Sequence, residues 1–347
     1  MIHKHTTGFW EHHVAYPLEQ HIIQCLWDYY FPEVTHGVIL NTTYNFDTSL
    51  QWLNDIIDTH QVDAILITSL VDHVSEDTHL QLCKLAGNNP HIRIQLAGYN
   101  PYYFPNYDYV DFWALFMEQH FQQYTDEQLM PTDLKNVFLS YNRKPHRHRI
   151  ELYESIHGNA QDCQDVSALG VITLGNSLDE QGNPAHQYDV ISFPENTTGI
   201  LDQEDLGDDA YGIAGTATAL GNLTVWRESF LSVIAETNSS VDHHIPFITE
   251  KTYKSILGLR PFVTYGDGGN ERYLISNGYR TFTDRLGMGE IFSPAALNQA
   301  IRRLADQNLN DLYAEWLPDI IHNRNNFYNH CHKIRHKFKI IDIDNNS

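Results

Sequence analysis

Residues 142–149 of this sequence, Asn-Arg-Lys-Pro-His-Arg-His-Arg, combine side chains that could bind a phosphorylated ligand. They follow an apolar run and lead into a helical pattern, so three arginines stand where a strand gives way to a helix. A guanidinium group can bind two phosphate oxygens at once, which makes Arg143, Arg147 and Arg149 candidates for holding a diphosphate. The alternative is a solvated basic helix start, which is electrostatically unfavourable because cations there oppose the helix dipole.

A second group of charged side chains lies at 247–254, Phe-Ile-Thr-Glu-Lys-Thr-Tyr-Lys. Thr249 can cap a helix whose first turn holds Glu250 and Lys251, and a Gly-Asp-Gly-Gly turn around Gly268 follows the next apolar run. Exposed backbone N–H groups at such corners bind phosphate or sugar hydroxyls. Acidic and basic residues are also common on the first turn of any surface helix, so this segment alone does not specify a ligand.

A third polar segment, Glu236-Thr-Asn, closes an apolar run that predicts a strand ending at the same sheet edge. Glu236 and Asn238 could accept and donate hydrogen bonds to a sugar or a ribose, although a glutamate here is by itself more often a turn residue. The specific feature is the joint occurrence of all three segments.

The elements that must position these residues follow a βαβ pattern. In the first third of the chain, short β-branched runs alternate with longer amphipathic ones, which predicts strands and helices around a parallel sheet. The expected strands there are 38–40, 64–68 and 92–96, and the expected helices are 47–60, 76–85 and 111–123. A second series has strands at 136–140, 171–174 and 230–236, with helices at 147–157 and from 249, while 175–222 and 99–109 are expected to be irregular.

Two series of this kind in 347 residues predict an α/β protein with two doubly wound, Rossmann-like domains. We place an N-terminal domain at 1–132 and a C-terminal domain, with helices at its end, at 133–347. Two such domains facing a central cleft would bring the carboxyl ends of two sheets together, where ligands of these folds usually bind.

Composition excludes several classes of protein. A formal charge of −22 opposes a long electrostatic track for duplex nucleic acid, and the absence of a run of about 18 apolar residues argues against a signal peptide or membrane span. The four cysteines are widely spaced without a CxxC pair, which favours a reducing, cytoplasmic location. We predict no metal site, because the 21 histidines include neither HExxH nor paired Cys-His spacing.

The three segments resemble the donor-nucleotide region of the α1,3-fucosyltransferase family, whose pattern includes Glu-Asn-Ser followed by Tyr-(Ile/Val)-Thr-Glu-Lys. The likeness is carried by Glu236-Thr-Asn, by 247–254 and by Gly258-Leu-Arg-Pro-Phe-Val. It is closer still to fucosyltransferase-like proteins of large DNA viruses and phages, in which an Asn-Arg…His-Arg element precedes Thr-Glu-Lys-Thr. The matching residues in that element are Asn142, Arg143, His148 and Arg149. The resemblance covers roughly residues 136–285.

The resemblance implies a GT-B fold that holds a sugar nucleotide mainly on its C-terminal domain. Lys251 and Arg149 or Arg143 would neutralise the diphosphate, and Glu250 would hold the ribose or the donor sugar. Glu236 and Asn238 would line the donor pocket. Such enzymes invert the anomeric carbon without a metal in catalysis, since basic side chains and helix N–H groups meet the charge of the leaving diphosphate.

A carboxylate in the N-terminal domain serves this family as the base that deprotonates the acceptor hydroxyl. The N-terminal part of this chain shows no match, so we take Glu11, Asp72 and Glu76 as candidate bases because each lies near an expected strand end or loop. The loop before Glu250 looks longer than in fucosyltransferases, with Val241-Asp-His-His-Ile-Pro inserted, so the transferred sugar is not fixed by the likeness.

The sequence therefore predicts a metal-independent, inverting glycosyltransferase that moves a sugar, with fucose as one candidate, from a nucleoside-diphosphate sugar to a hydroxyl of a glycan, protein or small molecule. One alternative is transfer to a modified base in phage or viral DNA, which the acidic charge disfavours. Another is a non-catalytic glycan-binding or virion-associated protein of the same fold.

Overall fold

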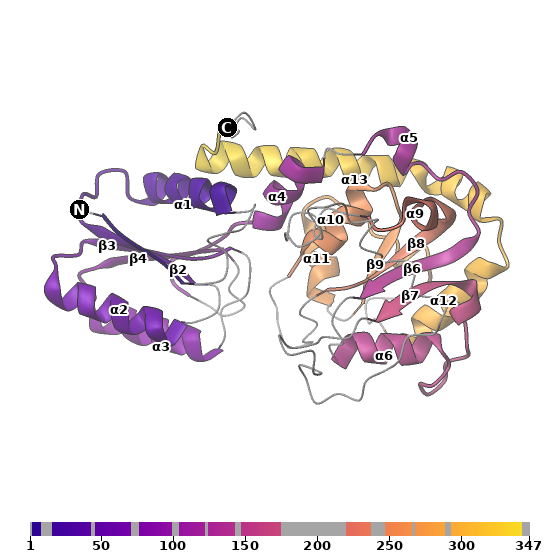
Figure 1. The fold of residues 1–347 in the computed structure, drawn as a ribbon, viewed down its shortest axis with the longest axis horizontal. Helices are drawn as coiled ribbons and strands as arrows, with labels where there is room; N and C mark the ends of the chain where they lie inside the picture. Colours follow the sequence, from indigo (N-terminus) through magenta and orange to yellow (C-terminus); the bar gives the residue numbers. More distant parts are fainter. Residues whose placement is uncertain are drawn as a thin grey trace. The chain divides into compact units, whose positions relative to one another are not determined.

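The computed structural model describes residues 2–7, 16–42, 46–70, 76–98, 104–121, 124–142, 147–174, 220–236, 247–265, 268–288 and 293–341 (Figure 1). Of these, the residues up to Glu118 and from Asn329 onward form one compact unit, and those from Gln119 to Tyr328 form a second. We call them unit 1 and unit 2. Each unit is an α/β structure built on a parallel sheet.

Unit 1 contains a five-stranded parallel sheet whose strands lie in chain order, β1-β2-β3-β4-β5. The strands are β1 (Ile2–Thr7), β2 (Gly37–Thr42), β3 (Ala64–Ser69), β4 (Arg93–Gly98) and β5 (Tyr107–Tyr109). All six residues of β3 are buried, as expected for an inner parallel strand that is covered on both faces. Figure 1 shows α1 (Tyr16–Tyr30) on one face, and α2 (Phe46–Thr59) and α3 (Glu76–Asn88) on the other.

Helix α1 packs through apolar side chains that recur at helical spacing. The buried members of this stripe are Leu18, Ile22, Ile23, Leu26 and Trp27. Trp27 lies directly against the first residue of β2, because a Cβ atom on Gly37 would be 2.1 Å from its ring. Glycine at this position therefore allows the helix to approach the sheet closely.

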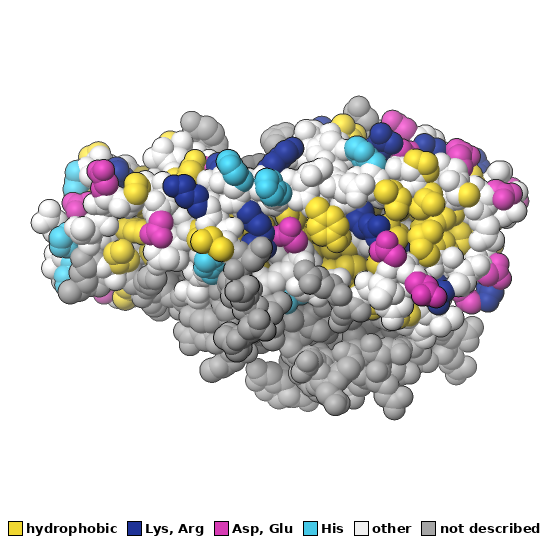
Figure 2. Space-filling model, turned by 90° about the horizontal axis from the view of Figure 1, so that it is seen from above, with side chains coloured by type: hydrophobic (Ala, Val, Ile, Leu, Met, Phe, Trp, Pro, Cys, Tyr) yellow, Lys and Arg dark blue, Asp and Glu magenta, His cyan; other side chains and the backbone are white. Residues whose placement is uncertain are grey.

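Unit 1 is completed by α4 (Phe112–His120) up to Glu118 and by the end of the C-terminal helix, α13 (Leu309–Phe338). Arg335 Nε donates to Glu118 Oε2 at 2.7 Å, and His330 Nε2 lies 3.0 Å from Asp111 Oδ2. These contacts explain why the division falls at 118/119, earlier than the expected 132/133, and why the last residues belong with the first ones. Acidic and basic side chains are interspersed on the face shown in Figure 2.

Unit 2 contains a four-stranded parallel sheet with the order β7-β6-β8-β9. Its strands are β6 (Asn136–Asn142), β7 (Gly170–Leu174), β8 (Ser229–Ala235) and β9 (Phe262–Tyr265). The order reverses between β6 and β8, because β7 is added on one side of β6 and the later strands on the other. This is the expected doubly wound arrangement, with its switch point at the carboxyl ends of β6 and β8. The sheet of unit 1 has no such reversal, since each strand pairs with the one before it.

The helices of unit 2 cover both faces of this sheet (Figure 1). They are α5 (Asp126–Leu129), α6 (Arg147–Ile156), α9 (Leu223–Glu228), α10 (Glu250–Leu257), α11 (Gly268–Ser276), α12 (Pro294–Ala305) and α13, with a 3-10 turn at Ser167–Leu169. Helix α12 begins as its sequence predicts, with Pro294 in the first turn and the Ser293 hydroxyl accepting from Ala296 N at 3.1 Å.

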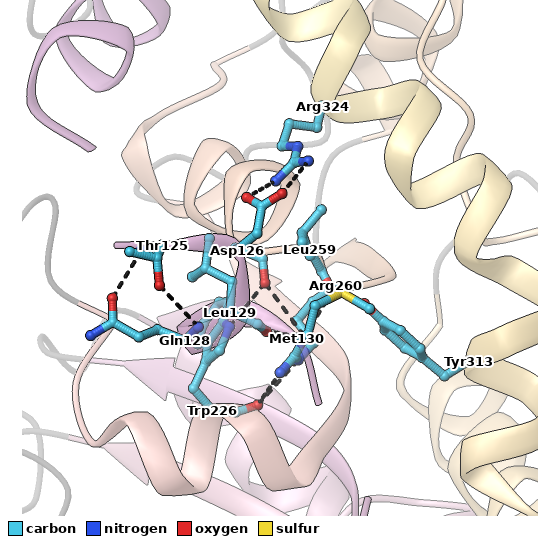
Figure 3. Close-up of polar contacts among 11 residues, drawn as sticks. Thr125, Asp126, Gln128, Leu129, Met130, Trp226, Leu259, Arg260, Tyr313 and Arg324 are labelled. Carbon is cyan, nitrogen blue, oxygen red and sulfur yellow. Dashed lines mark hydrogen bonds and ion pairs between the residues drawn. The ribbon is translucent and has the colours of Figure 1, made fainter. Parts of the chain in front are cut away.

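The C-terminal end of α10 is held by a buried arginine (Figure 3). The Arg260 guanidinium is 2% exposed and donates to the carbonyl oxygens of Leu129 at 3.0 Å, Trp226 at 2.9 Å and Leu259 at 2.8 Å. It lies over the rings of Trp226 and Tyr313, and burial lowers its pKa to about 10. The ends of α5 and α9 and the residues after α10 therefore share one cation, which suits the negative ends of helix dipoles.

The expected helices over 47–60, 76–85 and 147–157 agree closely with α2, α3 and α6, and 111–123 corresponds to α4. The sequence did not predict α1, β1, α9 or the short strand β5, which falls within the expected loop 99–109. Most of the expected irregular region 175–222 lies outside the described residues. Among the helices that are described, none is long and apolar enough to cross a membrane.

Candidate functional site

The polar residues singled out in the sequence gather where β6 and β8 end in unit 2. Asn142 is the last residue of β6, and Glu236 directly follows β8, so both lie at the switch point of the sheet. Asn142 is buried, and its side-chain amide donates to Ser140 Oγ at 3.0 Å. The strand ends thus bring two polar side chains from distant parts of the chain to one edge.

Glu236 fastens α10 to the end of β8. Its side chain is fully buried, with Thr252 Oγ1 donating to Oε1 at 2.6 Å and Thr249 N donating to the same oxygen at 3.2 Å. Thr249 Oγ1 donates to Oε2 and also accepts from Lys251 N at 3.4 Å, which makes Thr249 the N-cap of α10. Burial raises the pKa of Glu236, although Lys251 and the two threonine hydroxyls act against this rise. The carboxyl group is therefore engaged in positioning the helix.

The first turn of α10 carries an ion pair that is partly accessible to solvent. Lys251 Nζ lies 2.7 Å from Glu250 Oε1 and 3.3 Å from Thr249 Oγ1, and the side chains of Lys251 and Glu250 are 24% and 16% exposed. Burial acts to raise the pKa of Glu250, but Lys251 and Lys254 together lower it below its ordinary value. Burial lowers the pKa of Lys254 to about 8, against the opposing effect of Glu250. Glu250 is therefore ionised at neutral pH and interacts with two lysines.

Helix α6 adds a buried cation and a histidine. Arg149 is 2% exposed, and burial lowers its pKa while the carboxylates of Glu236 and Glu250 raise it, so its charge acts on both. His148 Nε2 lies 2.7 Å from the carbonyl oxygen of Glu236, and because a carbonyl only accepts, this nitrogen carries the proton. Burial lowers the pKa of His148. The start of α6 is thereby docked on the end of β8.

The described part of the site has more positive than negative charge. Three cationic side chains, Arg149, Lys251 and Lys254, stand beside two carboxyl groups, Glu236 and Glu250. A half-buried surplus of positive charge at a switch point is suited to binding an anion.

The structure brings together six of the residues proposed from the sequence, namely Asn142, Arg149, Glu236, Thr249, Glu250 and Lys251. Arg147 points elsewhere, since its side chain is 86% exposed and pairs with Glu151 at 2.9 Å. Gly268 begins α11. The other proposed residues, Arg143, Asn238, Glu11 and Asp72, lie outside the described residues, and for Glu76 only its place at the start of α3 is described.

Unit 1 contains a buried polar chain that sequence reasoning missed. Asn41 on β2 donates to Glu19 Oε1 at 2.9 Å and accepts from Thr68 Oγ1 on β3 at 3.0 Å. All three side chains are at most 1% exposed, and burial raises the pKa of Glu19. The sequence contained an indication of this buried carboxyl group, because Glu19 lies between Leu18 and Ile22 on the apolar face of α1. A carboxyl group on such a face is costly without a partner.

No group of three or more potential metal ligands occurs within the ranges that the structure describes. Comparison of the chain with protein-family models, with curated proteins and with solved structures finds no match in any of the three.

Proposed function

We propose that this protein is an inverting glycosyltransferase of GT-B type that transfers a sugar from a nucleoside-diphosphate sugar to a hydroxyl group. The observation that carries the proposal is the surplus of positive charge at the carboxyl ends of β6 and β8, with Lys251 partly exposed at the start of α10. A diphosphate is the part of the donor that such a site would hold. The two α/β units, each with a parallel sheet, are compatible with this architecture.

Each charged residue would have a separate role in transfer. Lys251 and the N–H groups at the start of α10 would bind the diphosphate, and Arg149, which is buried, would act on it through its electrostatic field. Glu250 would accept hydrogen bonds from ribose or sugar hydroxyls. Glu236, which is fully buried, would keep α10 in place.

The chemistry requires one bond to break as another forms. The bond between the anomeric carbon and the diphosphate oxygen breaks with both electrons going to the diphosphate, whose charge Lys251 and Arg149 stabilise. The acceptor oxygen attacks the same carbon from the opposite side, which inverts it, and its proton passes to a carboxylate base. The candidate bases for this step are Glu11, Asp72 and Glu76.

The proposal is tested by titrating the protein with GDP, UDP, dTDP and their sugars in a calorimeter and by measuring hydrolysis of each sugar nucleotide. We expect the protein to prefer one nucleobase and to hydrolyse slowly the sugar nucleotide that contains it. Lys251→Met should weaken this binding about a hundredfold, whereas Lys135→Met, which also breaks an ion pair in unit 2, should leave it unchanged. Absence of both binding and hydrolysis across the panel would disprove the proposed function.

Measurements of sugar transfer and of DNA binding distinguish the proposed function from its two alternatives. A protein that binds a sugar nucleotide or a glycan but transfers nothing in a screen of donors against acceptors would be a binding module. Transfer to modified DNA would require an affinity for DNA that falls steeply with salt. The formal net charge of −22 favours a smaller acceptor.

A further inference from the structure

The ion pair on the first turn of α10 joins two adjacent residues, which is an unusual arrangement in a helix. Side chains at successive positions normally point in different directions, and favourable pairs are three or four residues apart. Here Lys251 Nζ nevertheless lies 2.7 Å from Glu250 Oε1, and the same ammonium group lies 3.3 Å from Thr249 Oγ1. Both side chains therefore fold back over the start of the helix.

Glu250 has a second cation available. Lys254 is four residues further along α10, the spacing and order in which a glutamate and a lysine interact favourably on a helix. Each affects the other, since Lys254 lowers the pKa of Glu250 and Glu250 raises that of Lys254. If Lys251 turns toward a ligand, Glu250 keeps a positively charged neighbour.

Any anion that binds Lys251 must compete with the Glu250 carboxylate for the same ammonium group. Two negative charges that share one ammonium group repel each other, and solvent and counterions reduce this repulsion only in part. A ligand with phosphate alone gains the lysine and meets this repulsion. A ligand that also carries hydroxyl groups gives the carboxylate new donors.

We propose that Glu250 determines the specificity of this site by acting as the internal counter-ion of Lys251, so that ligands with phosphate alone are disfavoured and ligands with both diphosphate and hydroxyl groups are selected. This inference rests on the proposed function, because it assigns Lys251 to the diphosphate of a sugar nucleotide. With this role, Glu250 makes the site discriminate against ligands that carry phosphate but no hydroxyl groups. Free pyrophosphate and inorganic phosphate, which lack sugar hydroxyl groups, would be kept out.

The test compares pyrophosphate with the best-binding sugar nucleotide of the GDP, UDP and dTDP panel, using calorimetry on the full chain. Glu250→Gln keeps the size of the side chain and removes its charge. We expect it to bind pyrophosphate about tenfold more tightly and the sugar nucleotide several-fold more weakly than the wild type, a shift of about 1.4 kcal/mol for each factor of ten. Glu315→Gln is the matched control, since Glu315 also pairs with a basic residue of unit 2, Arg285, at 3.1 Å.

A double-mutant cycle separates a direct contact from a general change in charge. In the Lys251→Met background, Glu250→Gln should no longer improve pyrophosphate binding, because the lysine that it releases is gone. An equal improvement in that background, or in Glu315→Gln, would overturn the role of Glu250. Should Glu250→Gln fail to fold, Glu250→Ser supplies the same loss of charge with a residue suited to a first turn.

The remaining outcomes separate this inference from the proposed function. If the wild type binds a sugar nucleotide but Glu250→Gln gains nothing toward pyrophosphate, the counter-ion role is wrong and the proposed function stands. If the wild type binds neither pyrophosphate nor any sugar nucleotide, both are wrong.

Discussion

The two ends of α10 each carry a buried charge of the sign that the helix dipole favours, yet they differ in what they leave accessible. At the C-terminal end, Arg260 donates to main-chain carbonyls and lies over two aromatic rings, with 2% of its surface exposed. At the N-terminal end, Glu236 is equally buried, but Lys251 and Glu250 beside it are partly exposed. Burial of a charge therefore does not by itself indicate a binding site.

The same comparison distinguishes Thr249-Glu-Lys from Arg260-Pro, two segments on which the resemblance depends. The first supplies charged side chains that are accessible, whereas the second supplies a cation whose hydrogen bonds are made within the fold. The two segments would be needed for different physical reasons. Thr249-Glu-Lys would be needed to bind a ligand, and Arg260 to donate to the carbonyl groups at helix ends.

The largest effect should come from removing the buried cation. Arg260→Met leaves the carbonyls of Leu129, Trp226 and Leu259 without this donor, and we expect a loss of about 3 to 5 kcal/mol in unfolding free energy. Urea denaturation measures it. Arg285→Met is the control, because that side chain also lies over a tryptophan but is 38% exposed. Equal losses in the two variants would contradict the contrast between the ends of α10.

The opposite end should affect binding instead of folding. Lys251→Met should weaken binding of the preferred nucleoside diphosphate about a hundredfold, equivalent to about 2.7 kcal/mol, while changing unfolding free energy by less than about 1 kcal/mol. Calorimetry and urea denaturation on one preparation give both numbers. A large loss of stability with unchanged affinity would assign Lys251 to the scaffold, like Arg260.

The two ends should also differ in their response to pH. Because burial raises the pKa of Glu236, its contribution to stability is fully present below its ordinary value of 4.5 and is lost as pH rises through the raised pKa. The unfolding free energy of the wild type should therefore fall, relative to that of Glu236→Gln, by about 1 kcal/mol or more as pH rises above 5. Denaturation curves between pH 4 and 8 measure the difference. A constant difference across this range would show that Glu236 ionises normally.

The smallest effect on the unfolding free energy should come from removing the N-cap of α5, the helix whose last residue, Leu129, accepts a hydrogen bond from Arg260. Thr125 and Gln128 form a capping box at the start of α5, with Thr125 N donating to Gln128 Oε1 at 2.8 Å. Thr125→Ala should cost about 0.5 to 1 kcal/mol, since the exposed cap satisfies few donors. Combined with Arg260→Met it should add less than this, because α5 is already released. Full additivity in urea denaturation would indicate that the arginine does not depend on α5.

Local patterns in the sequence were sufficient to predict α2, α3, α6 and the start of α10, because their apolar positions and caps lie within a few residues of one another. The strand β1 was missed because Ile-His-Lys-His-Thr-Thr has no apolar run, which is acceptable in an edge strand. Helix α1 was missed although its apolar residues do recur at helical spacing.

The candidate site could be predicted in part for the same reason. Asn142, at the end of a predicted strand, and Glu250, in the first turn of a predicted helix, were identified from local sequence. The partners of Glu236 and Arg260 were not, because the residues that bond Glu236 are 13 and 16 positions away and Leu129 is 131 positions from Arg260. Such long-range contacts determine which charged side chains are buried with partners inside the fold and which stay accessible.

The helix α13 has a consequence for how the chain is made. It leaves unit 2 after Tyr328, and its remaining residues supply Arg335 to Glu118 and Cys331 to the carbonyl of Ala114 in unit 1. Residues of α4 in unit 1 thus obtain contacts from residues 217 positions later in the sequence. Unit 1 therefore has an incomplete surface until the ribosome has synthesised the end of α13.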